Sequence, residues 1–257
     1  MDPLQLEIQQ FIRGAVATAG TTTEYRQPQV GFARADDPRF RVLRDEVSPI
    51  HLMPEDLVPG AQTVVSFFLP FAAWVVEANA RSKADVAREW AVAYVETNAL
   101  IGRISAGLVE ALAAKGIAAA AEPATHNFDE VTLHSPWSHK SVAVIAGLGS
   151  FGLHQMVITD AGCAGRFGSV VLDAGIPFRE AEPRVRCLGL YDGSCLECVA
   201  RCPVSALSAD IPLDKQRCDQ HLHDFGRAYE DLGLVDVCGK CAIGPCSFSS
   251  AVPPSQP

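Results

Sequence analysis

The sequence predicts an α/β or α+β core followed by a smaller, loop-rich domain. Segments with helical periodicity and short β-branched runs intermix through about residue 180. Eight of the nine cysteines then lie at or beyond residue 187. We therefore expect a core over residues 1–184 and a cysteine-rich domain over residues 185–257.

The first half of the core contains three expected elements. Residues 4–16 have the pattern of a helix, and the rest of the first 60 residues reads as polar, proline-containing loop. Residues 63–69 form a β-branched and aromatic run that is typical of a buried strand. Residues 83–115 carry apolar side chains at spacings of three, four or seven, which predicts helix. Gly102 and Gly107 could divide that segment into two helices.

The second half of the core has shorter elements and ends in a linker. A helix is expected at residues 137–146, and extended segments at residues 117–121, 155–159 and 168–173. Pro183 and several charged side chains make the stretch from about residue 177 to residue 186 a plausible linker.

The composition excludes some classes of protein. The 257 residues are 48% hydrophobic and carry a formal net charge of −9, without any basic run. Nucleic-acid binding depends on clustered Lys and Arg, so nucleic acid is an unfavourable partner. The longest apolar stretch, residues 63–76, is too short for a membrane span. We expect no membrane association, and a cytoplasmic protein whose thiols stay reduced.

The cysteines carry the strongest functional signal. Cys195, Cys198, Cys202 and Pro203 form C-x2-C-x3-C-P, the core of a bacterial-ferredoxin ligand run. In such runs the cysteine before the proline binds the other of two clusters. Eight thiolates are the number that two 4Fe–4S clusters need. The eight candidate ligands are Cys187, Cys195, Cys198, Cys202, Cys218, Cys238, Cys241 and Cys246.

Disulfide bonds and a zinc site are the two alternative uses of these cysteines. A disulfide framework is typical of small secreted domains, and the first residues have no signal-peptide pattern. A four-thiolate zinc site would leave four cysteines unexplained and would not account for the Cys-Pro ending. Two spacings are irregular: seven residues separate Cys187 from Cys195, and four separate Cys241 from Cys246.

A glycine motif precedes the cysteines. Residues 147–152 satisfy G-x-G-x-x-G, with Asp173 about twenty residues later, as in dinucleotide-binding proteins. The preceding residues read as helix rather than strand, so the context does not fit that fingerprint. The glycines could allow tight packing, or could let bare backbone approach a flat cofactor.

Several motifs together resemble the superfamily of epoxyqueuosine reductases and reductive dehalogenases. The resemblance extends from about residue 54 to residue 248. The motifs are Trp137-Ser-His-Lys140, Ala146-Gly-Leu-Gly149 continuing to Gly152, Ile158-Thr159, Gly168-Ser-Val-Val-Leu-Asp173 and Leu213-Asp-Lys-Gln-Arg-Cys218, with the double cysteine motif.

The resemblance implies a fold and cofactors. It implies a nitroreductase-like core that binds cobalamin and a C-terminal ferredoxin-like domain with two 4Fe–4S clusters. It also implies crossed ligand sets: Cys187, Cys195, Cys198 and Cys246 on one cluster, and Cys202, Cys218, Cys238 and Cys241 on the other.

The chain also departs from the epoxyqueuosine reductases. The position of their proton-donating aspartate is Leu133 here, and the sequence ends soon after Cys246. The export signal usual in dehalogenases is absent. We therefore expect a divergent relative with a substrate other than tRNA, and the family's catalytic residue cannot be transferred.

Candidate site residues follow from the motifs and the resemblance. His134 and His139 are the candidate proton donors. Cys163, the cysteine outside the cluster groups, is either a free buried thiol or a cofactor contact. The cofactor-binding candidates are Trp137, Gly147, Leu148, Gly149, Phe151, Gly152, Cys163, Arg166, Gly168 and Ser169.

The sequence is compatible with two functions. One is an oxidoreductase that reduces a small molecule at a cobalamin, with electrons from an external ferredoxin, flavodoxin or reductase. The other is a non-enzymatic protein that transfers electrons or handles a corrinoid for a partner enzyme. A core of about 180 residues exceeds what a simple electron carrier needs, which favours the enzyme.

Overall fold

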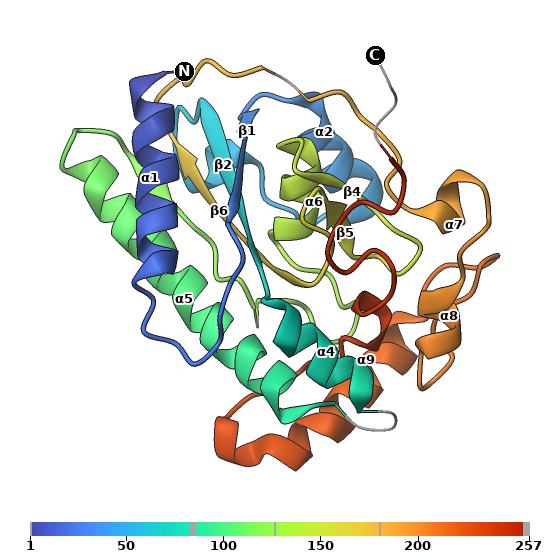
Figure 1. Ribbon diagram of the computed structural model, residues 1–257. Helices are drawn as coiled ribbons and strands as arrows, with labels where there is room; N and C mark the ends of the chain where they lie inside the picture. Colours follow the sequence, from blue (N-terminus) through green and yellow to red (C-terminus); the bar gives the residue numbers. More distant parts are fainter. Residues whose placement is uncertain (1, 83–85, 126, 180, 254–257) are drawn as a thin grey trace.

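A four-stranded antiparallel sheet lies at the centre of the computed structural model (Figure 1). The structure describes residues 2–82, 86–125, 127–179 and 181–253. In spatial order the strands are β1 (Gln29–Arg34), β2 (Thr63–Pro70), β6 (Gly165–Leu172) and β3 (Ala119–Ala120). The mixture of helices and strands confirms the predicted class at this level.

Helices and one small hairpin complete the fold. The hairpin consists of β4 (Gly149–Phe151) and β5 (Val157–Thr159). The α-helices of the core are α1 (Pro3–Ala17), α2 (Pro38–Val42), α3 (Pro54–Leu57), α4 (Ala73–Arg81), α5 (Arg88–Ala113) and α6 (His139–Ile145). Those that follow are α7 (Leu188–Tyr191), α8 (Glu197–Arg201) and α9 (Lys215–Gly226). Three short segments are the π-helix η1 (Leu43–Val47) and the 3-10 helices η2 (Arg227–Leu232) and η3 (Lys240–Ala242).

Helices cover both faces of the sheet, which explains why β2 is buried along its whole length. Val65 and Phe67 pack on the face that α1 and α5 cover, whereas Val64 packs on the face of α2 and α6. Side chains of a strand alternate between its faces, so a strand covered on both sides is apolar throughout. The continuous apolar run in the sequence is a consequence of this sandwiching.

The N-terminal region contains more structure than the sequence predicted. Strand β1 lies where we expected loop, and it pairs with β2 in a register from Gln29 opposite Phe68 to Arg34 opposite Thr63. Helices α2 and α3 and segment η1 also lie in that region. The predictions of α1, β2 and β6 are confirmed.

Helix α5 is continuous, so the expectation of a break at Gly102 or Gly107 is wrong. It begins at Arg88, and residues 83–85 of the predicted helix lie outside the described residues. A Cβ at Gly107 would lie 3.0 Å from the ring of Phe11, so the lack of a side chain here lets α1 pack closely against α5. Packing against α1 and the sheet stabilises the helix despite both glycines.

The C-terminal region packs directly on the core. Cys187, Ala242 and Ile243 share a buried apolar cluster with Val75 and Trp90 of α4 and α5. Between residues 185 and 253 the chain forms helices and loops without a strand. The division into two domains near residue 184 stays a prediction.

None of the helices within the described ranges is both long and apolar enough to cross a membrane.

Substitution of Gly102 by alanine tests the continuity of α5. A Cβ there would have no heavy atom within 4 Å, and glycine in a helix is about 1 kcal/mol less favourable than alanine. We expect Gly102→Ala to raise the free energy of unfolding by about that amount in urea titrations. Gly107→Ala is the matched control and should gain less, because its Cβ meets Phe11. A destabilised Gly102→Ala variant would contradict the continuous helix.

Candidate redox site

The thiols of the first cysteine group affect one another. Burial, followed by the neighbouring thiols of Cys187, Cys246 and Cys195, raises the pKa of Cys198 to about 11. These four are the set that the resemblance assigned to one cluster.

The second group behaves in the same way. Burial raises the pKa of Cys218 to about 11, with further contributions from Cys238 and Cys202. The pKa of Cys241 is raised by burial and then by Cys238 and Cys218, with smaller effects of Cys198 and Cys202. These neighbours match the second ligand set, and the effect of Cys198 on Cys241 shows that the two groups adjoin.

Local structure explains the irregular spacing between Cys187 and Cys195. The intervening residues form α7, with Cys187 at its N-cap, so the chain turns back. A Cβ at Gly189 would lie 2.6 Å from the carbonyl oxygen of Cys195 and 3.6 Å from Cys187 Sγ. Glycine at this position therefore lets the two cysteines approach each other.

The thiol groups suit iron–sulfur clusters better than zinc. Burial and neighbouring thiols raise the pKa of Cys198, Cys218 and Cys241, so these thiols stay protonated near pH 7 unless metal ions compensate the charge of their thiolates. A cubane takes one thiolate on each of four irons, so its ligands lie farther apart than those around one ion. Throughout the described ranges, no four thiols lie close enough to surround a single ion. The donor set therefore fits two clusters.

A cavity of about 280 Å³ separates the second cysteine group from the core. Its walls include Cys202, Cys218, Cys238 and Cys241 on one side. On the core side they include Trp90, Tyr94, Lys140, Met156 and Arg166. A second cavity of about 320 Å³ shares Lys140, Met156 and Arg166 and extends to Trp137 and His139. The candidate cluster site and the candidate cofactor residues thus meet at one place.

Two cationic side chains lie at the junction of these cavities. The guanidinium carbon of Arg166 is 4.4 Å from the centroid of the Tyr94 ring. The Nε atom of Arg166 is buried and has no hydrogen-bond partner within the part of the chain that the structure describes. Lys140 Nζ donates to the carbonyl of Gln155 at 3.2 Å. Burial lowers the pKa of both groups, which favours a ligand with anionic or carbonyl oxygen atoms.

His139 belongs to a buried hydrogen-bond network. Its Nε2 atom lies 3.2 Å from the carbonyl oxygen of Pro123, and Nδ1 lies 2.8 Å from Ser169 Oγ, which also accepts from Trp137 Nε1 at 2.8 Å. The Pro123 carbonyl can only accept, so Nε2 carries the proton and Nδ1 accepts from the serine. Burial lowers the pKa of His139 to about 4, so the ring is neutral at pH 7. Nδ1 therefore links α6 to β6, and Nε2 links α6 to the loop that contains Pro123.

His134 is placed differently. It lies half-buried in the loop before α6, and its carbonyl accepts from the Asp129 amide at 2.9 Å. It is not among the residues that line the two cavities. A role as proton donor stays a prediction for either histidine, and the geometry supports Lys140 better.

The glycines of residues 147–152 pack against the protein itself. A Cβ at Gly149 would lie 2.4 Å from the carbonyl oxygen of Ile158, and one at Gly147 would lie 2.7 Å from Ala181 Cβ. Gly168 likewise packs against Phe67. The tight-packing interpretation therefore accounts for these glycines, and approach of bare backbone to a cofactor is not needed to explain them. Helix α6 precedes these residues and strand β4 lies within them, whereas a dinucleotide-binding motif needs a strand before the glycines and a helix after them.

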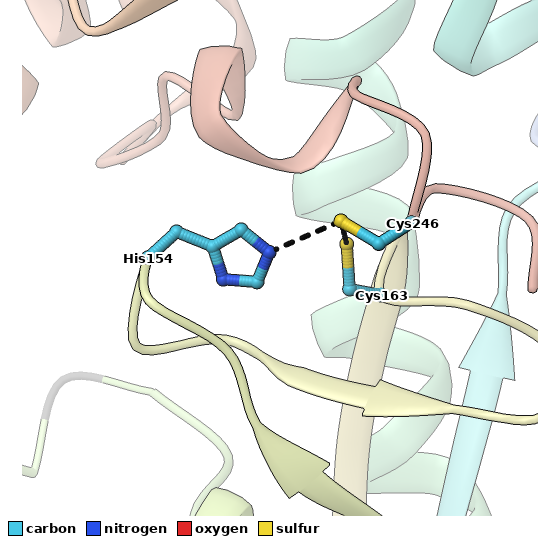
Figure 2. Close-up of side chains that lie close together, drawn as sticks. All are labelled: His154, Cys163 and Cys246. Carbon is cyan, nitrogen blue, oxygen red and sulfur yellow. Dashed lines mark hydrogen bonds between the residues drawn. The ribbon is translucent and has the colours of Figure 1, made fainter. Parts of the chain in front are cut away.

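Cys163 and His154 contact a candidate cluster ligand (Figure 2). Cys246 Sγ lies 3.7 Å from Cys163 Sγ and 3.3 Å from His154 Nε2. The hydrogen bond from Cys163 lowers the pKa of Cys246, and the His154 contact lowers it too, although burial opposes both. The same hydrogen bond, together with burial, raises the pKa of Cys163.

Sequence reasoning missed Lys140, His154 and Tyr94 as site residues. Lys140 stands next to His139 in the sequence, and Tyr94 follows Trp90 by one helical turn on α5. These spacings were visible, but a lysine at a helix start and an aromatic pair on an amphipathic helix are also ordinary features. His154 has no spacing signal and is identified only by the hairpin.

Comparison with known proteins supports the predicted resemblance. No family model matches the chain. An epoxyqueuosine reductase of Yersinia pestis is 27% identical over 107 residues, which are 39% of this chain and 25% of that protein. The resemblance is confirmed. The matched part spans a quarter of that relative.

Solved structures show the same fold. The structure of the Bacillus subtilis epoxyqueuosine reductase superposes with a TM-score of 0.58 at 16% identity, covering 95% of this chain and 66% of that one. The Streptococcus thermophilus enzyme gives 0.56 at 17% identity, with 98% and 69% covered. A catabolic reductive dehalogenase gives 0.57 at 17% identity, with 94% and 32% covered. This chain therefore spans about two thirds of the epoxyqueuosine reductases.

Removal of the Ser169 hydroxyl tests the buried network. In Ser169→Ala, Trp137 Nε1 and His139 Nδ1 would lose their partner, and we expect a loss of about 1–3 kcal/mol in the free energy of unfolding. Ser66 lies directly opposite Ser169 on β2, and its buried hydroxyl has no partner in the described structure. Ser66→Ala is therefore the matched control and should change stability little. Equal losses in the two variants, measured by urea unfolding at pH 7, would contradict the network.

Proposed function

We propose that this chain is a reductase in which two 4Fe–4S clusters deliver electrons to a corrinoid that reduces a small molecule. The supporting observation is the cavity whose walls combine the four thiols of the second group with Lys140 and Arg166 of the core. Electron transfer needs such proximity between a cluster and the cofactor that it serves. Similarity to epoxyqueuosine reductases and reductive dehalogenases supports a reductase.

The proposed ligand sets are those that the thiol neighbours define. Cys187, Cys195, Cys198 and Cys246 would hold the first cluster. Cys202, Cys218, Cys238 and Cys241 would hold the second. The amide of Ala206 donates to Cys202 Sγ at 3.2 Å, as expected for a thiolate ligand.

Residues at the cavity junction would bind the corrinoid. Its side-chain amides offer carbonyl oxygens, which suit the unpartnered Nε of Arg166. When bound, the corrinoid would supply the reactive metal for reduction of the substrate. Lys140 can hold a proton on Nζ at the cavity wall, and burial favours its release. Trp90, Tyr94 and Met156 line the same cavity with apolar surface and would limit the entry of water.

A small molecule is the proposed substrate. One structurally similar reductase was crystallised with a tRNA stem loop, and other similar structures are dehalogenases. The net charge of −9 opposes long-range attraction to a polyanion. Electrons would come from an external ferredoxin, flavodoxin or reductase.

Metal analysis tests the clusters. Protein purified without oxygen should contain about eight irons and eight sulfides, because eight thiolates are available for two cubanes. Cys198→Ser should lose one cluster and keep most of the other. Cys163→Ser should keep both and serves as the matched control. One or two zinc ions with no iron after reconstitution would contradict the proposal.

Titration with cobalamin tests the corrinoid part of the proposal. The iron-loaded protein should show saturable changes in visible absorbance as cobalamin is added. Arg166→Met should weaken binding by about tenfold or more, since it removes a charged hydrogen-bond donor. Arg41→Met, at an exposed position on α2, should bind like the unchanged protein. Absence of binding by the unchanged protein would favour the non-enzymatic electron carrier instead.

A further inference from the structure

The β4–β5 hairpin holds a histidine against the candidate ligand Cys246 (Figure 2). The hairpin closes through a hydrogen bond from the Gly152 amide to the Met156 carbonyl at 2.9 Å. A Cβ at Gly152 would lie 2.8 Å from His154 Cε1, so the glycine leaves room for the imidazole ring. His154 is buried, with 4% of its surface exposed. The last glycine of the G-x-G-x-x-G motif thus positions this ring.

The backbone fixes the tautomer of His154. The Met156 amide donates to Nδ1 at 3.0 Å, so Nδ1 must carry a lone pair. A neutral imidazole then has its proton on Nε2, and Nε2 lies 3.3 Å from Cys246 Sγ. The only role left for Nε2 in this contact is that of a hydrogen-bond donor to sulfur.

Cys163 approaches the same sulfur from another element. The Cys163 amide donates to the carbonyl of Cys246 at 2.9 Å, which fixes the two residues side by side. A Cβ at Gly162 would lie 2.2 Å from the carbonyl oxygen of Ser247, so the two segments are in close backbone contact. Cys163 Sγ lies 3.7 Å from Cys246 Sγ and is fully buried. Its thiol can donate to the neighbouring sulfur.

We infer that His154 and Cys163 are positioning residues that donate hydrogen bonds to the Cys246 thiolate and raise the reduction potential of the cluster that Cys246 binds. This inference rests on the proposed function for the cluster itself. A donor to a ligand sulfur stabilises negative charge, and the reduced cluster carries one more electron than the oxidised one. The donors therefore favour reduction of the cluster that Cys246 binds.

A single metal ion held by His154, Cys163 and Cys246 is the competing interpretation. Their ligand atoms lie within 4.8 Å of one another, which would suit such an ion. However, a metal must bind the lone pair of an imidazole nitrogen, and the Met156 amide leaves Nε2 protonated. The hydrogen-bond interpretation requires no change in this structure.

Potentiometric titration followed by electron paramagnetic resonance tests the inference on the full iron-loaded chain. His154→Leu should keep its iron and shift the potential of one cluster to a more negative value, leaving the other unchanged. His154→Gln, whose amide can replace the Nε2–H donor, should restore most of the shift. Cys163→Ala should cause a smaller shift of the same cluster in the same direction.

His223→Leu is the control, because His223 is exposed on α9 and pairs with Asp219. It should leave both potentials unchanged. If His154→Leu and Cys163→Ala retain both clusters with unchanged potentials, the inference fails while the proposed function stands. Loss of one zinc ion, rather than a shift in potential, in both variants would establish the competing metal site. Absence of clusters from the unchanged protein would overturn the proposed function instead.

Discussion

The burial and half-burial of cysteine thiols beside one another is the constraint on which the rest of this structure depends. Burial, followed by neighbouring thiols, raises the pKa of Cys198 in one set and of Cys218 and Cys241 in the other. Removing such groups from water costs free energy that only positive charge can compensate. The two 4Fe–4S clusters that we propose would supply that charge, and the surrounding fold would then have to place them beside the cavity.

The core would provide this placement through the helices and the hairpin that lie near the start of β6. Trp90 and Tyr94 on α5, Lys140 on α6 and Arg166 on β6 all line the cavity that the second cysteine group closes. A side-chain hydrogen bond reinforces the arrangement, since Asn79 Nδ2 of α4 donates to the backbone carbonyl of Cys238 at 3.0 Å. The cysteine-rich segment therefore forms part of the wall of the cavity.

The sequence was most informative where local rules decide the structure. Cysteine spacing predicted eight ligands for two clusters, because a ligand run has to bring thiols to one point through a short loop, whereas the crossed ligand sets were implied by the family resemblance. The apolar spacing of α5 predicted its helix, but glycine content suggested a break that tertiary packing prevents. Strand β1 was not predicted, because pairing with β2 rather than a pattern in its own sequence makes this segment a strand.

Site residues whose contacts lie far away in the sequence were harder to predict. His154 is a site residue because hairpin geometry carries it to Cys246, 92 residues later in the chain. The glycines were singled out as candidates to contact a cofactor, with close packing as the alternative, and sequence alone could not say whether protein or cofactor fills the space beside them. Arg166 was identified as a cation for a ligand, and only the structure shows that its Nε is buried without a partner.

The central claim is that two cysteine sets hold two neighbouring 4Fe–4S clusters. The most direct measurement is electron paramagnetic resonance of the fully reduced protein at low temperature. Because Cys241 adjoins Cys198 of the other set, the spins of the two clusters should interact and give a split, complex spectrum. A spectrum of two independent signals, or of no iron–sulfur centre at all, would contradict the account.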